Sequence, residues 1–346
     1  MNQKSISVII PAYNVADFVG ECIESVISQN INDLEIIIIN DGSTDNTLEI
    51  CNKYASKDNR IRIIDQSNKG VSAARNNGLK NCNGDWVMFV DADDWLEKDA
   101  LTSVIPLLDS SKTDLVAFAL KEGNFVEDKN YDVKEFSVNE YRRELLGYCI
   151  ISTHDWPSLF PAELLSDMNL NGPVAKLFRR KILIDNDILF DETMKIAEDQ
   201  DFNLQYIACI NSIKYYNRPY YNVRIRNTSA SRSISGVLDN HQTANKKLSE
   251  RIEALSMSDG LNIYWKAHLI EDLLIITRII ADNKYQFTEF WGKIRELKGF
   301  IKQNQYRQAI KRFPKHLINS KKKKVMIMLY NYNLVYFVNL LYRYFR

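Results

Sequence analysis

Three aspartates, Asp91, Asp93 and Asp94, follow directly after the apolar run WVMFV at residues 86–90. Carboxylates this close repel one another unless a positive charge lies among them. Mg²⁺ takes oxygen ligands and commonly uses one or two carboxylates together with phosphate oxygens. If the chain stays extended, Asp91 and Asp93 point the same way and share a metal ion and a phosphorylated ligand. The alternative is that the cluster only caps and solvates a loop, and we assign Asp94 to capping a helix near Lys98 or to solvent.

Polar residues also follow two strands that the sequence predicts earlier in the chain. The predicted strand SISVII leads to Pro11 and Tyr13, and LEIIII leads to NDGSTD with Asp41 at its tip. In open parallel sheets, ligands bind beyond the carboxyl ends of the strands. We therefore expect Asp41 and Asp91 to lie on one rim of the sheet, although fifty residues separate them.

Two further segments bring charge to this rim. NKGVSAARNNG offers a polar loop that begins at Asn68, and Arg75, which needs carboxylates or a ligand as its partner. A simple ion pair with an aspartate at the sheet edge accounts for Arg75 equally well. AEDQDF places Glu198 and Asp199 at the start of a predicted helix. Acidic residues stabilise helix N-termini through the dipole, and the alternative is a general base that takes a proton from an attacking hydroxyl.

Alternating strand and helix patterns must position these residues. Short apolar runs typical of buried parallel strands alternate with segments of helical spacing: strands at 5–10, 34–39, 60–65 and 85–90, and helices at 15–29, 45–56 and 71–82. Crossovers between parallel strands need helices, so these repeats predict an α/β fold with a mostly parallel sheet. Further along, EDQDFNLQYIACI predicts a helix, IKYYNRPYYNVRI predicts a β-hairpin or strand pair, and the pattern is helical from His241 onward.

Six motifs occur together in one order: SVIIPAYN, NDGSTD, NKGVSAARNNG, DADD, AKLFRR and EDQDF. In this order and rough spacing they resemble the family 2 glycosyltransferases, which have the GT-A fold, a Rossmann-like mostly parallel sheet. The likeness extends from Ser5 to about Arg226. It implies a hexosyltransferase that uses a nucleotide-sugar donor, most often UDP-linked, and inverts the anomeric carbon. It also implies a divalent cofactor, Mg²⁺ or Mn²⁺.

The resemblance assigns roles to positions of this sequence that match the family motifs. Pro11 and Tyr13 would flank the base. Asp41 would hydrogen-bond the uracil, and Asn68 and Arg75 would complete the nucleotide pocket.

For the reacting end of the donor, the resemblance implies that Asp91 holds the ribose or a metal-bound water and that Asp93 coordinates the metal. Asp199 would be the general base, with Glu198 beside it. Lys176 and Arg179 match basic positions of AKLFRR, and we assign them no role.

The resemblance and the patterns together predict two domains. A GT-A domain covers residues 1–235, with a nucleotide-sugar-binding half at 1–120 and an acceptor half at 121–235. A helical, basic extension follows at 236–346. The irregular middle of the chain holds His154, Trp156 and Phe160. Aromatic residues there line an acceptor pocket or serve as packing anchors, and we expect His154 to be structural.

Two other functions compete with glycosyl transfer. A nucleotidyltransferase also combines an α/β sheet with metal-binding carboxylates, but such enzymes resemble one another in a glycine-rich loop after the first strand. Here PAYNVADF has no glycine before Gly20. The other alternative is a nucleotide-sugar-binding protein without catalysis, against which the presence of both Asp93 and Asp199 argues.

The distribution of charge and cysteine suggests where the protein acts. Residues 297–346 hold twelve Lys or Arg and no Asp or Glu, whereas the preceding part holds 33 basic and 44 acidic residues. KKKK at 321–324 precedes an aromatic-rich segment with amphipathic spacing, which suits a membrane interface, although a terminal helix packed on the protein is the alternative. The five cysteines are scattered, which favours a reducing compartment. We expect a cytoplasmic protein at the inner face of the membrane, with a saccharide or lipid-linked saccharide acceptor and no nucleic-acid partner.

Overall fold

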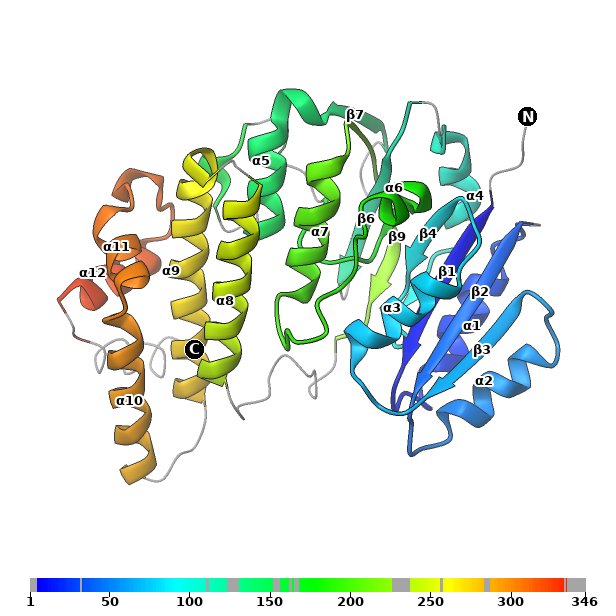
Figure 1. The fold of residues 1–346 in the computed structure, drawn as a ribbon, viewed down its shortest axis with the longest axis horizontal. Helices are drawn as coiled ribbons and strands as arrows, with labels where there is room; N and C mark the ends of the chain where they lie inside the picture. Colours follow the sequence, from blue (N-terminus) through cyan, green and yellow to red (C-terminus); the bar gives the residue numbers. More distant parts are fainter. Residues whose placement is uncertain are drawn as a thin grey trace. The chain divides into compact units, whose positions relative to one another are not determined.

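A computed structural model of the chain describes residues 5–31, 33–109, 112–122, 131–151, 156–161, 164, 168–225, 237–255, 258–282, 287–332 and 334 (Figure 1). The chain forms two compact units. The sheet unit comprises Met1–Leu145 and Ser166–Asn227, and the helical unit comprises Leu146–Leu165 and Thr228–Arg346. The predicted domain boundary after residue 235 lies outside the described residues. Residues 146–165, which the sequence analysis placed in the acceptor half, cluster with the helices instead.

The strands of the sheet unit join in one sheet with the order β3-β2-β1-β4-β8-β6-β9-β5, and β7 pairs with β9. Their bounds are β1 (Ile6–Ala12), β2 (Leu34–Asp41), β3 (Ile61–Gln66), β4 (Trp86–Phe89), β5 (Trp95–Leu96), β6 (Leu115–Glu122), β7 (Val133–Ser137), β8 (Lys176–Arg179) and β9 (Ser212–Val223). β3, β2, β1 and β4 are parallel, as predicted. β8 runs antiparallel to both β4 and β6, so the sheet is mixed beyond β4.

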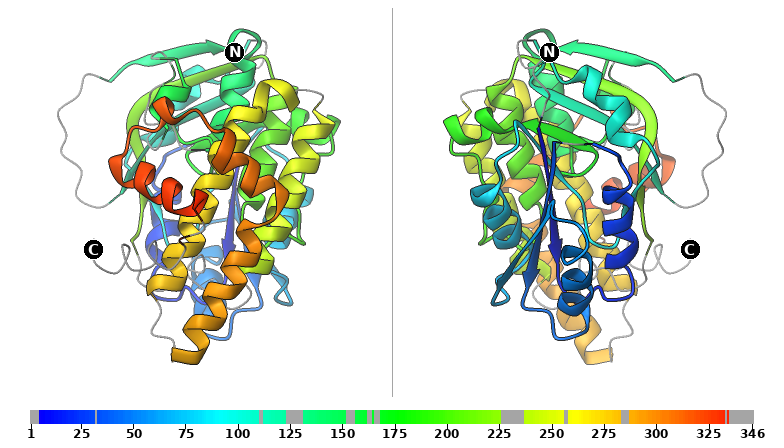
Figure 2. Two further views of the ribbon diagram at one scale, coloured as in Figure 1. Left: turned by 90° about the vertical axis from the view of Figure 1, so that its left-hand side faces the viewer. Right: turned by 90° about the vertical axis from the view of Figure 1, so that its right-hand side faces the viewer.

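The helices that follow these strands are α1 (Val19–Ile27), α2 (Thr47–Ala55), α3 (Val71–Asn81), α4 (Ala100–Val104), α5 (Val138–Ile150), α6 (Arg180–Asp185) and α7 (Glu198–Cys209). Strand side chains alternate between the two faces of the sheet. Val8 and Ile10 pack in a core with Val19 and Cys22 of α1, whereas Ile9 faces Gly78 of α3. α1 and α3 therefore cover opposite faces of the parallel strands (Figure 2).

The segment predicted as a hairpin is a single strand. β9 runs without interruption from Ser212 to Val223. Its pairing with β6 shifts register opposite Phe118 and Ala119, close to Pro219. Proline cannot donate a ladder hydrogen bond and is tolerated at such bulges. The hairpin prediction was therefore wrong, because a local irregularity in a long strand resembles a turn in the sequence.

The helical unit contains α8 (Val237–Ala254), α9 (Ser258–Asp282), α10 (Phe287–Ile301), α11 (Asn304–Arg312) and α12 (Lys321–Asn331). Trp156 and Phe160 are buried in it, against Phe313 at 5.1 Å and Tyr264 at 5.3 Å between ring centroids. The packing alternative for these two aromatic residues is thus confirmed, and His154 lies outside the described residues.

One face of α12 packs within the helical unit. Met326, Ile327 and Tyr330 are buried, and the Tyr330 hydroxyl hydrogen-bonds Thr277 of α9. The described helix ends at Asn331, and of the predicted amphipathic pattern beyond it only Tyr332 and Leu334 lie within the described residues. Across the described ranges, no helix combines the length and the apolar character needed to cross a membrane.

Candidate active site

The loops at the carboxyl ends of β1 and β2 are tied together. The parallel register sets Pro11 beside Ile39, so both strands end at the same edge of the sheet. Beyond them, Thr44 donates its backbone N–H to the Asn14 side chain at 2.8 Å. Tyr13 is 47% exposed at this edge. A large aromatic side chain left open beside a polar loop is available for stacking on a base, and its contact with a nucleotide stays a prediction.

Asp41 organises the adjoining loop. Its carboxylate is buried and accepts from the Gln66 side chain at 2.8 Å and from the backbone N–H groups of Lys69 and Gly70 at 2.9 and 2.8 Å. A carboxylate offers about four lone-pair positions, so roughly one remains for a ligand. Asn68 is exposed in this loop, and its place in a nucleotide pocket stays a prediction. The loop also passes close to Gly42, whose φ is +70°.

Arg75 of α3 is the centre of the site. Its side chain is only 4% exposed. One terminal nitrogen donates to Asp199 Oδ1 at 2.7 Å, and the other donates to Asp91 Oδ1 at 3.0 Å. Glu198 lies 3.9 Å away, and the guanidinium stands over the Phe190 ring at 5.2 Å. One buried cation thus joins the loop after β4 to the first turn of α7, which lie far apart in the sequence.

Three carboxylates with different surroundings lie around the Arg75 guanidinium. Burial raises the pKa of Asp199 to about 7, although the Arg75 guanidinium acts in the opposite direction. Glu198 and Asp91 add to the rise through charge repulsion. Burial by itself lowers the pKa of Arg75, but the three carboxylates raise it overall, so the guanidinium stays charged. A carboxyl group with a pKa close to neutrality is suited to taking and releasing a proton.

Ala197 brings Asp199 into this position. It precedes α7 and has a φ of +61°, a left-handed conformation that is uncommon for a residue with a side chain. Such backbone strain of about 1–3 kcal/mol persists only where the surrounding structure imposes it, and it clusters at functional sites. Here the strained residue directly precedes Glu198 and Asp199.

The divalent cation at Asp91 and Asp93 stays a prediction. The chain is not extended there, as the sequence analysis assumed, because residues 91–94 form a turn in which the Asp94 backbone N–H donates to the Asp91 carbonyl oxygen at 2.9 Å. Within the described residues, no group of three or more His, Cys, Asp or Glu side chains could hold a metal ion. Mg²⁺ in phosphate-binding sites needs fewer protein ligands, because water and phosphate oxygens complete its shell. Asp91 is 37% exposed and uses Oδ1 for Arg75, which leaves Oδ2 open in the described part of the chain. The donor set thus suits a hard cation that binds together with a phosphorylated ligand.

The role assigned to Asp94 was wrong. Asp94 is buried at 5% exposure and is neither solvated nor a cap of α4, whose N-cap position is Asp99. Its Oδ2 accepts from the Tyr221 hydroxyl at 2.9 Å, and its Oδ1 accepts from the Arg224 backbone N–H at 2.9 Å. Burial raises the pKa of Asp94 to about 7, with a further contribution from Asp91. Asp94 therefore anchors the loop after β4 to the end of β9.

The sequence analysis missed Arg224. Its Nε donates to the Asp93 backbone carbonyl at 2.9 Å, and its guanidinium pairs with Glu21. The same group lies over the Phe18 and Trp95 rings at 5.0 and 4.8 Å. Arg224 thus fixes the backbone of the aspartate loop. Arg224 is the second-last residue of the segment IKYYNRPYYNVRI, and nothing in that pattern marked it as a site residue.

Lys176 and Arg179 of β8 serve the scaffold. Lys176 is buried, and its ammonium donates to the carbonyl oxygens of Gly172 and Val174 at 2.6 and 3.1 Å. Arg179 lies 3.5 Å from Asp114. Lys176 closes the loop before β8, and its positive charge lowers the pKa of Asp199 slightly against the dominant effect of burial.

Known proteins resemble this chain in sequence and in fold. The chain is 32% identical over 241 residues to the glycosyltransferase GlyA of Streptococcus pneumoniae serotype 4, which covers 66% of this chain and 31% of that protein. It is 27% identical over 336 residues to a hyaluronan synthase of Pasteurella multocida, covering 95% of this chain and 31% of that protein. The chain thus spans about a third of the length of these two relatives.

A crystal structure of S. aureus TarS 1–349 in complex with UDP-GlcNAc has the same fold. It matches with a TM-score of 0.58 at 21% identity, over 99% of this chain and 91% of that one. The GT-A fold expected from the sequence is therefore confirmed. The profile of Glycosyl transferase family 2 matches residues 7–186, which include the rim, the aspartate loop and Arg75. The chain belongs to the family 2 glycosyltransferases.

Proposed function

We propose that this glycosyltransferase moves a sugar from a UDP-linked donor to a hydroxyl group of a saccharide acceptor, with inversion at the anomeric carbon. The observation that carries the proposal is the shared guanidinium of Arg75. It holds Asp91, on the rim where the donor is expected, and Asp199, the candidate base, within hydrogen-bonding distance of one side chain. A donor site and a proton acceptor are thereby adjacent.

Asp199 is the proton acceptor in this mechanism. The acceptor hydroxyl gives its proton to Asp199 while its oxygen attacks the anomeric carbon. The bond from that carbon to the phosphate oxygen breaks on the opposite face, and its electron pair leaves with UDP. A single displacement converts an α-linked donor into a β-linked product. Arg75 keeps Asp199 oriented, and its charge favours the ionised form that accepts the proton.

Asp91 and Asp93 would hold Mg²⁺ or Mn²⁺ at the rim. When bound, such an ion neutralises negative charge on the diphosphate leaving group. Arg224 contributes by fixing the Asp93 backbone. Asp41, at the end of β2, holds the loop that contains Asn68 and would receive the base, and Tyr13 offers its open ring there.

The acceptor class follows from the relatives by analogy. Hyaluronan synthase is named for a polysaccharide, and the TarS structure contains UDP-GlcNAc. We infer a role in the synthesis of a surface polysaccharide or glycolipid, with a free or lipid-linked saccharide as acceptor. Of the two alternatives, a nucleotidyltransferase would release pyrophosphate, and a binding protein without catalysis would form no product.

The membrane contact is part of this proposal. On α12 and just after it, Val325, Met328, Tyr332 and Leu334 are 44%, 51%, 69% and 40% exposed. The lysines at 321, 322 and 324 are also exposed. Apolar side chains beside clustered lysines suit an anionic membrane surface. This contact would place the protein at the cytoplasmic face of the membrane, near a lipid-linked acceptor.

A donor screen tests the catalytic part. The purified protein is incubated with several UDP-sugars, Mg²⁺ or Mn²⁺, and simple or lipid-linked saccharides, and UDP and pyrophosphate are measured. We expect acceptor-dependent release of UDP and a β-linked product from an α-linked donor. Release of pyrophosphate would favour the nucleotidyltransferase, and UDP binding without turnover on any acceptor would favour the binding protein.

Sedimentation with vesicles tests the membrane part. The double variant Lys321→Gln with Lys324→Gln should bind phosphatidylglycerol vesicles about thirtyfold more weakly, because each lysine near an anionic surface contributes roughly 1 kcal/mol. The control Lys57→Gln with Lys80→Gln removes the same charge from exposed positions of the sheet unit. Equal behaviour of the two variants would contradict the contact.

A further inference from the structure

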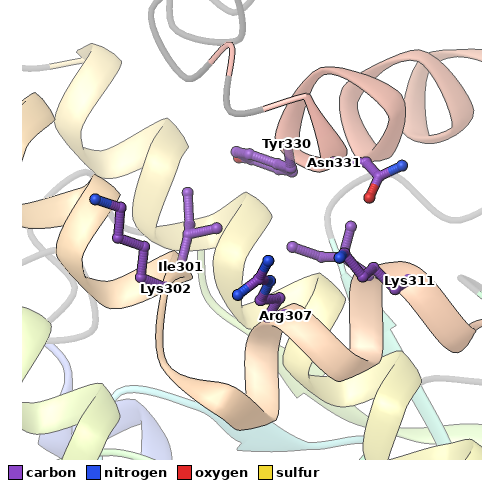
Figure 3. Close-up of a pocket in the computed structure, with 7 residues that line it drawn as sticks. Ile301, Lys302, Arg307, Lys311, Tyr330 and Asn331 are labelled. Atoms are coloured by element: carbon purple, nitrogen blue, oxygen red, sulfur yellow. The ribbon is translucent and has the colours of Figure 1, made fainter.

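A cavity of about 340 Å³ lies in the helical unit between the end of α10, α11 and α12 (Figure 3). Lys302 follows α10, and Arg307 and Lys311 lie one turn apart on α11. Figure 3 shows Tyr330 and Asn331 of α12 across the cavity from Arg307 and Lys311. The cavity is thus lined by both basic and apolar side chains, and all of its lining belongs to one unit.

The basic lining residues carry three uncompensated charges. Lys302, Arg307 and Lys311 are exposed. In the described part of the chain, none of the three side chains has a hydrogen-bond or ion-pair partner. The sequence offers no local acid either, since residues 297–346 contain no Asp or Glu. Three cations around one hollow repel one another, and binding an anion would relieve this repulsion.

The geometry favours a phosphate group among possible anions. Residues four apart on a helix lie on the same side, so Arg307 and Lys311 approach a ligand together. A guanidinium offers two parallel N–H donors that match phosphate oxygens, and lysine adds a point charge. A phosphate ester carries enough oxygens and charge to engage all three side chains, whereas a single carboxylate has two oxygens.

The apolar lining residues indicate what the phosphate is attached to. Ile301, Ile310 and Tyr330 are buried at 6%, 6% and 3% exposure where they line the cavity. The Tyr330 hydroxyl is already hydrogen-bonded to Thr277, so it is not needed by a ligand. Beside the cavity, Met328 on the outer side of α12 is 51% exposed. A ligand with a charged head and an apolar portion satisfies both kinds of lining residue.

We propose that this cavity binds the phosphate ester group of an anionic lipid, with Lys302, Arg307 and Lys311 as its ligands. The site extends the membrane contact proposed above from a diffuse attraction to a defined headgroup site. It is separate from the nucleotide rim, which belongs to the sheet unit. A soluble phosphate ester would meet the same three cations, so the test must distinguish the two sources.

Calorimetric titration of the full chain with dihexanoylphosphatidic acid, kept below its micelle concentration, measures the site without a membrane surface. The pocket variant is Lys302→Gln with Arg307→Gln. Its matched control is Lys315→Gln with Arg312→Gln, which removes one lysine and one arginine from exposed positions that do not line the cavity. Because all four side chains are exposed, both variants should fold, and their melting temperatures should confirm it.

We expect the pocket variant to bind the short-chain lipid at least about tenfold more weakly than the unmodified protein, as for the loss of charge-assisted hydrogen bonds. The control should remain within about twofold, since neither of its side chains lines the cavity and salt screens exposed charges that do not contact the ligand. Inorganic phosphate should bind more weakly than the lipid and lose affinity in the same variant.

Equal losses of lipid affinity in the two variants would show that only net charge matters and would overturn the proposed binding site. Inorganic phosphate binding as tightly as the lipid would overturn the lipid source, and the absence of lipid binding would overturn the whole proposal. The vesicle experiment with Lys321→Gln and Lys324→Gln can fail independently, because neither residue lines the cavity.

Discussion

Replacing Arg75 by methionine would remove the cation that joins the two sides of the site. The side chain keeps a similar length, but Asp91 and Asp199 lose their shared donor. Removing one partner of a buried ion pair costs about 3–5 kcal/mol, because the remaining charge is left buried. Arg75 is 4% exposed, but Asp91 and Asp199 are 37% and 29% exposed, and solvent partly screens them. We therefore expect a loss near the lower end, about 3 kcal/mol in the free energy of unfolding.

The loss in the free energy of unfolding should be larger at high pH than at low pH. The pKa of Asp199 is already raised to about 7. Removing the Arg75 charge, which opposes this rise, raises it further. A group whose pKa is higher in the folded than in the unfolded state contributes stability at low pH, and that contribution is lost as the pH rises through the folded-state pKa. The variant should thus lose less stability, relative to the unmodified protein, at pH 5 than above pH 7.

Urea unfolding at pH 5 and pH 8, followed by circular dichroism and tryptophan fluorescence, measures both effects. Arg75→Lys is the first control, because it keeps the charge but cannot donate to Asp91 and Asp199 through two separate nitrogens. Arg75→Met with Asp199→Asn is the second, since it removes the unpaired carboxylate and should recover about 1 kcal/mol or more. A loss below about 1 kcal/mol, or the same loss at both pH values, would refute the reasoning.

Four further predictions concern single residues of the site. Asp199→Asn should lower kcat at least about a hundredfold with little change in UDP-sugar binding. In the unmodified protein, kcat/KM should fall as the pH drops below about 7, because only the ionised carboxylate of Asp199 accepts a proton. Asp93→Ala should abolish stimulation of UDP release by Mg²⁺ while leaving the melting temperature unchanged. Asp94→Ala should lower the free energy of unfolding by about 2 kcal/mol in urea titrations, because it leaves two buried donors unpaired. Gly42→Ala should weaken UDP binding in calorimetry, because the added Cβ would lie 2.7 Å from the Asn68 backbone nitrogen at a φ of +70°.

The parallel part of the sheet could be predicted because its signals are local. The run LEIIII is apolar at every position except Glu35, a pattern typical of a strand buried on both faces. β8 could not be predicted in the same way. It has four residues, KLFR, and two of them are charged. Lys176 is nevertheless buried, because its ammonium finds two carbonyl oxygens in the preceding loop. Such compensation depends on tertiary contacts that no local pattern encodes.

The sequence analysis identified the site residues by their chemical type, but it did not identify the residues that contact them. Arg75 was expected to meet carboxylates or a ligand, and the structure provides carboxylates from two separate segments. Asp94 was assigned to solvent because three neighbouring aspartates look alike in the sequence. Its burial depends on Tyr221, which is 127 residues away. The contribution of each aspartate to metal binding, loop anchoring or catalysis is decided by such distant neighbours.

Stabilisation of the helix dipole would be a simpler explanation for the position of Asp199 at the start of α7. An acidic residue in the first turn gains about 0.3–1 kcal/mol from the helix dipole, which would lower its pKa by less than one unit. Arg75 acts in the same direction at 2.7 Å. The pKa of Asp199 is nevertheless raised to about 7, because burial outweighs both effects. A carboxylate present only to stabilise the helix would be placed where the dipole lowers its pKa and water solvates it. Asp199 is only 29% exposed, in surroundings that oppose ionisation, and one cation orients it. This is the environment that the proposed general base would need near neutral pH.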